Sequence, residues 1–291
     1  MKVSIVGPGA MGCLFAGRLS NAGVSTTLVD YKPDRIKRLR ASGITCETSS
    51  GTITSHPEVV STIPPGQDLV ICCVKSFATE SIEIPPDCSV LTLQCGLNNI
   101  ETLCSRVGSS RVLAGVTTEM AELVDEGRVR QTVSGVTHVG AWTSYPTAGT
   151  VKLLQAAGFR AEDSQSPGQA VWERVVIGCA VSPISAILGL PNGKLIEIPE
   201  VRQLMRDLVV EAVKVAAMEG YRFETSLIEE TERYCRDTAG FLTSMARDVI
   251  AKKRTEIEAL SGEVLHRGQM AGLPTPRTRV VYQLVKGLEM R

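Results

Sequence analysis

The first half of the chain contains short apolar runs and a segment whose apolar positions recur with the period of an α-helix. Five runs rich in β-branched and apolar residues have the length of a strand: Val3–Val6, Ser25–Val29, Leu69–Val74, Ser89–Leu93 and Val133–Gly140. The pattern of Ala10–Ala22, after the first run, is that of an amphipathic helix. Because most of these runs are apolar throughout rather than alternating, we expect strands covered on both faces, as in the parallel sheet of an α/β domain.

From Gly168 onward the apolar positions recur with the period of an α-helix. Four long helices are predicted, over Val171–Leu188, Val201–Glu219, Ser226–Leu242 and Thr243–Ala271. Gly272 and Pro274 end the last of these before a short terminal helix. The change of pattern, with Pro167 at the junction, predicts two domains: an α/β domain over residues 1–165 and an all-helical domain over residues 166–291.

Composition narrows the possible partners. The 291 residues carry 31 basic and 31 acidic side chains, and this balance argues against nucleic acid or an anionic membrane surface as a partner. The nine cysteines are scattered without a CxxC pair, which favours reduced, buried thiols over disulfides or a metal site. No run reaches the roughly 18 apolar residues of a membrane span, and the first residues begin a strand at once. We therefore expect a cytoplasmic protein without a metal.

A glycine-rich turn follows the first strand. Residues 7–12 read Gly-Pro-Gly-Ala-Met-Gly, which is G-x-G-x-x-G between a strand and an apolar helix. The first glycine permits the tight turn, the second lets the backbone approach a pyrophosphate, and the third lets helix and strand pack closely. A helix N-terminus offers free N–H groups to phosphates. The α/β domain is therefore predicted to be of Rossmann type, with Gly7, Gly9, Ala10, Met11 and Gly12 binding a dinucleotide.

Asp30 ends the second predicted strand, where a carboxylate can accept both hydroxyls of the adenosine ribose and repel a 2′-phosphate. This position favours NAD(H) over NADP(H) as the cofactor. Lys32 and Arg35 lie just downstream, and either could neutralise a phosphate instead. The sequence leaves that alternative open.

Several further motifs occur in an order that resembles the ketopantoate reductase family from end to end. They are the glycine turn, Val74-Lys75-Ser76, residues 91–99 (LTLQCGLNN), residues 134–140 (SGVTHVG), Ala186–Leu195 with Pro191-Asn192-Gly193, Ser244-Met245, Thr255-Glu256-Ile257-Glu258 and Pro274-Thr275-Pro276. The resemblance implies a Rossmann domain followed by a helical domain. It also implies hydride transfer from the nicotinamide to the C2 carbonyl of a small branched 2-oxoacid, foremost 2-dehydropantoate, a step of pantothenate and coenzyme A biosynthesis.

The resemblance also assigns roles to individual residues. Lys75 stands where the family keeps a lysine beside nicotinamide and substrate, and Ser244 matches a serine that holds the substrate carboxylate. Glu256 matches a glutamate that contacts the polar groups of the substrate and the catalytic ammonium. We therefore predict Lys75 and Glu256 as catalytic residues, with Ser244 and Glu256 binding the substrate.

Four positions depart from the family pattern. Cys95 and Arg174 stand where the family has an asparagine and the catalytic lysine, and Gly178 and Ser182 replace two further asparagines. Arginine stays protonated at physiological pH and is a poor proton donor. We therefore assign proton donation to Lys75 and polarisation or carboxylate binding to Arg174, with Ser182 beside the substrate and Cys95 near both substrate and cofactor.

These departures keep two alternatives open. A relative with the same fold could reduce a different 2-oxoacid, or join one to an amine as opine dehydrogenases do. A nucleotide-binding protein that has lost catalysis is the other. The apolar stripe of Val209, Val213 and Ala217 fits either a homodimer surface or the interior of the helical domain.

Overall fold

The computed structural model describes residues 1–291. The chain folds into two compact units. The first comprises Met1–Gln94 and Asn99–Gly168, and the second comprises Cys95–Asn98 and Gln169–Arg291. The short segment 95–98 thus belongs with the second unit although it lies between strands and helices of the first. Nothing in the local sequence pattern indicates that residues 95–98 belong to the second unit.

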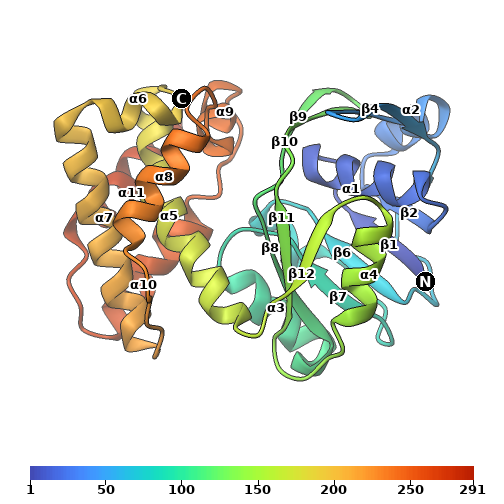
Figure 1. The fold of residues 1–291 in the computed structure, drawn as a ribbon, viewed down its shortest axis with the longest axis horizontal. Helices are drawn as coiled ribbons and strands as arrows, with labels where there is room; N and C mark the ends of the chain where they lie inside the picture. Colours follow the sequence, from blue (N-terminus) through green and yellow to red (C-terminus); the bar gives the residue numbers. More distant parts are fainter. The chain divides into compact units, whose positions relative to one another are not determined.

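The first unit is built on an eight-stranded sheet (Figure 1). Its strands, in spatial order, are β12 (Arg160–Asp163), β11 (Val136–Ala141), β8 (Val112–Thr117), β7 (Ser89–Thr92), β6 (Leu69–Cys72), β1 (Lys2–Val6), β2 (Ser25–Val29) and β5 (Glu58–Val60). Every neighbouring pair is parallel except β8 with β11. The predicted parallel sheet is confirmed, and β6 and β7 are buried along their whole length, as continuous apolar strands require.

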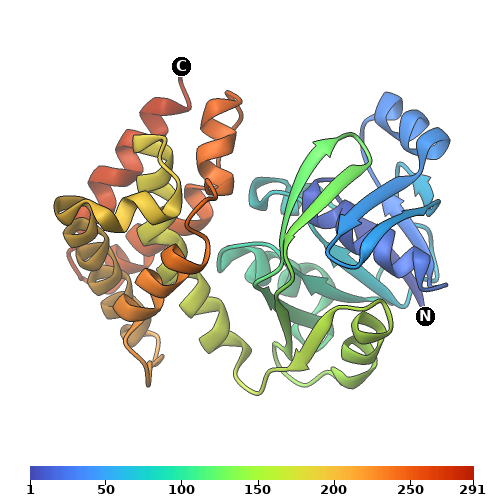
Figure 2. The same cartoon turned by 45° about the horizontal axis from the view of Figure 1, so that its top comes forward.

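A second sheet of four strands was not predicted from the sequence. Its order is β4 (Gly51–Ser55), β3 (Ile44–Thr48), β10 (Arg128–Val133) and β9 (Met120–Asp125), and Figure 2 shows the green β9–β10 hairpin beside the blue β3–β4 hairpin. These strands are mostly half-exposed and polar, so they lack the continuous apolar pattern of the main sheet. The predicted strand Val133–Gly140 is therefore wrong as one element. Val133 ends β10 and Val136 begins β11, because Gly135 passes so close to Thr118 that a β-carbon there would lie 2.2 Å from the Thr118 carbonyl carbon.

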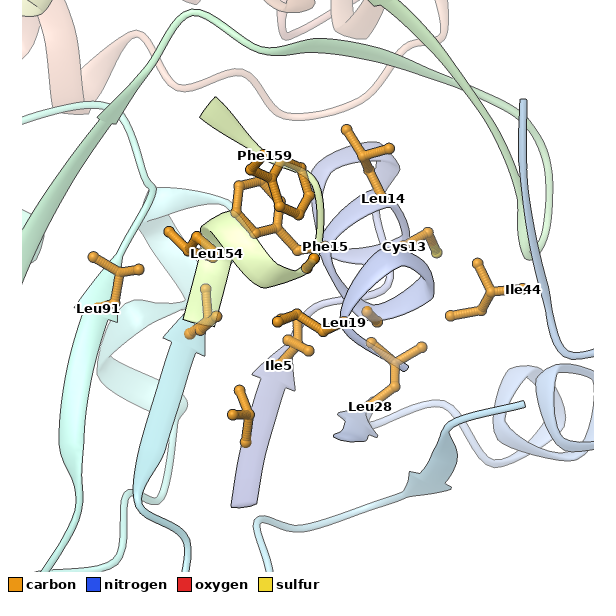
Figure 3. Close-up of a cluster of buried hydrophobic side chains, with 14 of the residues drawn as sticks. Ile5, Cys13, Leu14, Phe15, Leu19, Leu28, Ile44, Leu91, Leu154 and Phe159 are labelled. Atoms are coloured by element: carbon orange, nitrogen blue, oxygen red, sulfur yellow. The ribbon is translucent and has the colours of Figure 1, made fainter. Parts of the chain in front are cut away.

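Helix α1 (Ala10–Asn21) is the centre of the apolar core of this unit. Its side chains Cys13, Leu14, Phe15 and Leu19 are fully buried among strands of both sheets, as Figure 3 shows. The Phe15 ring stacks on Phe159, with their centroids 4.3 Å apart. The remaining helical segments are α2 (Pro33–Ser42), α3 (Asn98–Val107), α4 (Ala148–Ala156) and the 3₁₀ turns η1 (Ser76–Ser81) and η2 (Ser109–Arg111).

The second unit contains helices only, as predicted. They are α5 (Pro167–Leu188), α6 (Asn192–Glu197), α7 (Pro199–Met218), α8 (Leu227–Asp237), α9 (Ser244–Ile250), the π-helical turn η3 (Glu258–Gly262), α10 (Glu263–Met270) and α11 (Pro276–Leu288). Helix α5 is long and apolar enough to cross a membrane by length and composition, but 67% of that stretch is buried inside the structure. It forms the core helix of the unit. In the stripe considered for dimerisation, Val209 is buried, while Val213 and Ala217 are half-buried.

Two of the predicted helices are shorter than the sequence suggested. The stretch Thr243–Ala271 is not one helix, because the chain leaves α9 at Ala251 and Lys252 takes a left-handed conformation with φ 51°. Helix α8 ends at Asp237 rather than Leu242, and Thr238 caps it by donating from its hydroxyl to the Tyr234 carbonyl at 2.6 Å. An apolar period alone does not reveal such breaks when both sides of the break are helical.

Candidate functional site

The glycine turn of the first unit has the geometry of a phosphate cradle. Gly7 lies in a left-handed conformation with φ 101°, and a β-carbon there would lie 2.7 Å from the Val74 side chain. A β-carbon on Gly12 would lie 1.9 Å from the carbonyl oxygen of Gly7. The fold itself therefore demands glycine at both positions, as the tight turn and the close packing of helix on strand require.

Gly9 differs from the other two glycines. It precedes α1 with φ −80° and ψ −170°, a conformation open to any residue, and a β-carbon there would meet nothing within 4 Å. Protein packing gives no reason for glycine here, whereas a pyrophosphate over the helix N-terminus would need this space. The backbone N–H groups of Ala10, Met11 and Gly12 lie in the first turn of α1, where no intrahelical acceptor exists. These residues fit a dinucleotide.

Asp30 follows β2, but its carboxylate is not open to solvent. Arg35 on α2 binds both of its oxygens, with one of the two contacts at 2.6 Å, and the Asp30 side chain is only 1% exposed. The hydrogen bond to Asp30 raises the pKa of Arg35 above its ordinary value. The charges of Asp30 and Arg35 offset each other, so Lys32, which is exposed, is the other of the two cations expected beside Asp30.

Lys75 lies in the turn between β6 and η1 and is half-buried. The turn is fixed by Gln94, whose side-chain amide donates to the Val74 carbonyl at 3.0 Å and to the Thr79 hydroxyl at 2.7 Å. The Thr79 hydroxyl lies 2.9 Å from the side-chain oxygen of the buried Asn99. This buried polar network holds the backbone that carries Lys75.

A pocket in the second unit collects most of the other predicted site residues. It is lined by Cys95, Arg174, Gly178, Ser182, Ser244, Met245, Asp248, Glu256 and Leu260. Three of them lie four residues apart on α5, at positions 174, 178 and 182, and therefore share one face of that helix. The pocket thus combines one guanidinium with two carboxylates, two hydroxyls and a thiol.

Arg174 is the cation of this pocket. Its guanidinium carbon lies 5.4 Å from the centroid of the Tyr234 ring. Burial alone would lower the pKa of Arg174, but interactions with Tyr234 and Cys95 raise it above its ordinary value. The group therefore stays charged and is suited to holding an anion rather than to giving up a proton.

Helix α9 is fixed to α5 where it enters the pocket. Thr243 caps α9 by accepting from the Ala246 N–H at 3.1 Å, and its hydroxyl also donates to the Ser182 carbonyl at 3.5 Å. Ser244 and Asp248 follow on α9, four residues apart, so both lie on the face that lines the pocket.

The segment that carries Glu256 is fixed from the other side by α11. Glu289 accepts hydrogen bonds at 2.7 Å from both the backbone N–H and the hydroxyl of Thr255. Burial opposes ionisation of Glu289, but Thr255 and Lys286 keep its pKa below the usual value. The first turn after Glu256 is the π-helical turn η3, a geometry often found at functional sites.

The structure therefore brings Cys95, Arg174, Ser182, Ser244 and Glu256 together, while Lys75, Asp30 and the glycine turn lie in the first unit. Sequence reasoning missed Asp248 and Leu260 as pocket residues. Asp248 could have been found from its four-residue spacing to Ser244. For Tyr234 beside Arg174 no local signal exists, because the two residues meet only through a contact that is distant in sequence.

Comparison with known proteins agrees with these features. Residues 3–144 match the family model described as ketopantoate reductase PanE/ApbA, and residues 168–289 match its C-terminal model. The chain belongs to the ketopantoate reductase family. The 2-dehydropantoate 2-reductases of Halobacterium salinarum and Archaeoglobus fulgidus are 31% and 30% identical to it, with 98% or more of each chain covered.

Solved structures show the same fold. The PanE/ApbA family ketopantoate reductase from Ralstonia eutropha JMP134 has a TM-score of 0.91 at 32% identity, over 100% of this chain and 99% of its own. A D-mandelate dehydrogenase with NADH and anilino(oxo)acetate also has a TM-score of 0.91, at 23% identity and the same coverage. Family membership makes this chain a pyridine-nucleotide-dependent oxidoreductase. The four positions expected from the sequence to depart from the family pattern, Cys95, Arg174, Gly178 and Ser182, all line this pocket.

Proposed function

We propose that this protein reduces a small branched 2-oxoacid, foremost 2-dehydropantoate to pantoate, with a reduced nicotinamide nucleotide. The observation that carries the proposal is the pocket in which the fixed guanidinium of Arg174 stands beside hydroxyls and carboxylates. A guanidinium suits the carboxylate of a 2-oxoacid through paired hydrogen bonds. The carboxylates of Asp248 and Glu256 suit a hydroxyl donor such as the one that 2-dehydropantoate carries at its far end.

Each of the predicted site residues has its own role in this proposed reaction. When bound, a reduced nicotinamide cofactor would supply a hydride to C2, and negative charge would then develop on the carbonyl oxygen. Arg174 holds the substrate carboxylate and stabilises this charge, Ser182 and Ser244 donate hydrogen bonds, and Glu256 orients the substrate. Lys75 donates the proton that converts the oxyanion into the hydroxyl of the product, because an ammonium group, unlike a guanidinium, can give up a proton. Cys95 lines the pocket beside Arg174.

The glycine turn and Asp30 are proposed to hold the cofactor, with NADH preferred over NADPH. Gly7, Gly9, Ala10, Met11 and Gly12 form the phosphate cradle. Asp30 has the place at the end of β2 where a ribose diol is recognised in a Rossmann domain. Arg35 covers its carboxylate, so the Arg35 side chain, which is 22% exposed, turns aside when the diol binds. The charge of Arg35 is already offset by Asp30. Of the two cations that follow Asp30, only Lys32 could therefore bind a 2′-phosphate.

A second candidate function follows from the two carboxylates in the pocket. Asp248 and Glu256 would suit an ammonium group as well as a hydroxyl, which is the requirement of an opine-type reaction between a 2-oxoacid and an amine. A homodimer through the helical unit and a cytoplasmic location stay predictions.

The experiment is steady-state oxidation of NADH by the purified protein with a panel of 2-oxoacids, each with and without added amino acids. Turnover of 2-dehydropantoate without an amine supports the first proposal, and turnover that requires an amine supports the second. Tight NADH binding without turnover of any 2-oxoacid contradicts both and favours a non-catalytic protein.

A further inference from the structure

The aromatic ring of Tyr234 lies over the guanidinium of Arg174 in the second unit. Tyr234 comes from α8 and Arg174 from α5, and the 5.4 Å between the guanidinium carbon and the ring centroid is within the range of a cation–π contact. The side chains of Tyr234 and Cys95 also raise the pKa of Arg174, which places both of them next to the guanidinium. The guanidinium thus has partners from α8 and from the segment 95–98.

An arginine side chain has many rotamers in solution, and ordering it in a pocket costs conformational entropy. Contacts that are already made before the substrate arrives remove that cost from the binding step. Cys95 alone offers a thiol, a weak hydrogen-bonding group. The Tyr234 ring is the larger of the two partners, and it provides an aromatic face as well as a hydroxyl.

We propose that Tyr234 is a positioning residue for 2-oxoacid reduction, which holds the Arg174 guanidinium toward the pocket so that it is ready to bind the substrate carboxylate. This inference rests on the proposed function, since it assigns Arg174 the substrate carboxylate. Tyr234 itself does not line the pocket, so it acts through Arg174 rather than by touching substrate.

The position of Tyr234 is itself built into the fold. The Tyr234 carbonyl accepts from the Thr238 hydroxyl at 2.6 Å, and the buried Asn192 side chain donates to the same hydroxyl at 2.8 Å. The neighbouring Gly193 N–H donates to the Ala239 carbonyl at 3.1 Å, and a β-carbon on Gly193 would lie 2.6 Å from the Ala239 β-carbon. The Pro191-Asn192-Gly193 segment therefore supports the end of α8 that carries Tyr234.

The test is the affinity of the NADH-bound protein for oxamate, a carboxylate analogue of a 2-oxoacid, in Tyr234→Phe and Tyr234→Leu. Phe keeps the ring that contacts Arg174 and removes only the hydroxyl, so we expect oxamate binding to weaken by no more than about fivefold. Leu loses the ring as well, so a loss of about thirtyfold is expected. NADH affinity and melting temperature should stay unchanged in Tyr234→Phe. Tyr145→Phe, which removes a phenol from the first unit, is the matched control and should bind oxamate like the wild type.

A double-mutant cycle separates positioning from a general structural effect. In an Arg174→Met background, Tyr234→Phe should have no further effect on oxamate binding, because the group it positions is gone. Additive effects of the two changes, or wild-type oxamate affinity in Tyr234→Leu, would overturn the inference. The titration needs no turnover. If the wild type binds oxamate through Arg174 but reduces no 2-oxoacid, the proposed function is contradicted. The effect of Tyr234 on oxamate binding can still be measured in that case.

Discussion

The glycine turn of the first unit and the pocket of the second unit differ in how their residues are held. In the turn, six consecutive residues carry the whole phosphate cradle, and two of its glycines are fixed by the fold. In the pocket, the lining residues come from positions between 95 and 260 and meet only through tertiary contacts. The glycine turn therefore depends on local backbone geometry, whereas each pocket residue depends on the packing of a different segment of the chain.

Two glycines illustrate the contrast. A β-carbon on Gly9 would meet nothing within 4 Å, so the space above it is open for a ligand. A β-carbon on Gly178 would lie 3.2 Å from the Leu260 side chain, so the space beside it is already packed. The apolar side chain of Leu260 therefore forms the wall of the pocket beside Gly178.

The largest predicted effect is that of Gly9→Val on cofactor binding. The backbone at Gly9 accepts any residue and the site is open, so the protein should fold with an unchanged melting temperature. The added side chain would occupy the place of the pyrophosphate, and NADH affinity should fall by at least about a hundredfold, or roughly 2.7 kcal/mol. Gly149→Ala, at an equally open glycine in α4, is the control. A folded Gly9→Val protein with wild-type NADH affinity would refute the placement of the cofactor.

The second prediction concerns proton donation from the first unit. Lys75→Met should lower kcat by about a hundredfold or more, the usual size of a general-acid effect, with little change in NADH affinity. Steady-state rates and fluorescence titration with NADH measure the two quantities. A kcat within a few fold of the wild type would move proton donation away from Lys75.

The third prediction tests the Asp30–Arg35 pair as the determinant of cofactor choice. Asp30→Ala removes the ribose acceptor and frees Arg35 for a 2′-phosphate, so the preference for NADH should fall by about tenfold to a hundredfold. Arg35→Ala leaves Asp30 without its cation and should widen the preference. Dissociation constants for both nucleotides decide this. If the wild type binds NADPH more tightly than NADH, the assignment is wrong and Lys32 becomes the determinant.

Most of the fold could be predicted from the sequence, because the strands of the main sheet are continuously apolar and the glycine turn lies directly between β1 and α1. The four-stranded sheet was missed because its strands are largely polar and half-exposed, so they lack the continuous apolar pattern of the main sheet. The break after α9 was missed because the residues on both sides are helical. The pocket residues were predicted through family resemblance and not through spacing, so residues without a family motif, such as Asp248 and Tyr234, were not found.

Arg174→Lys tests most directly the claim that the pocket is a modified ketopantoate reductase site that still binds a 2-oxoacid through its cation. The measurement is kcat/KM for 2-dehydropantoate and for other 2-oxoacids, in the wild type and in Arg174→Lys. Lysine keeps the charge that holds the substrate carboxylate and adds a group that can donate a proton. The variant should therefore keep or raise kcat/KM for 2-dehydropantoate. If Arg174→Lys gives no turnover of 2-dehydropantoate and destroys activity on a different 2-oxoacid that the wild type reduces, the pocket is built for that other substrate and the claim is contradicted.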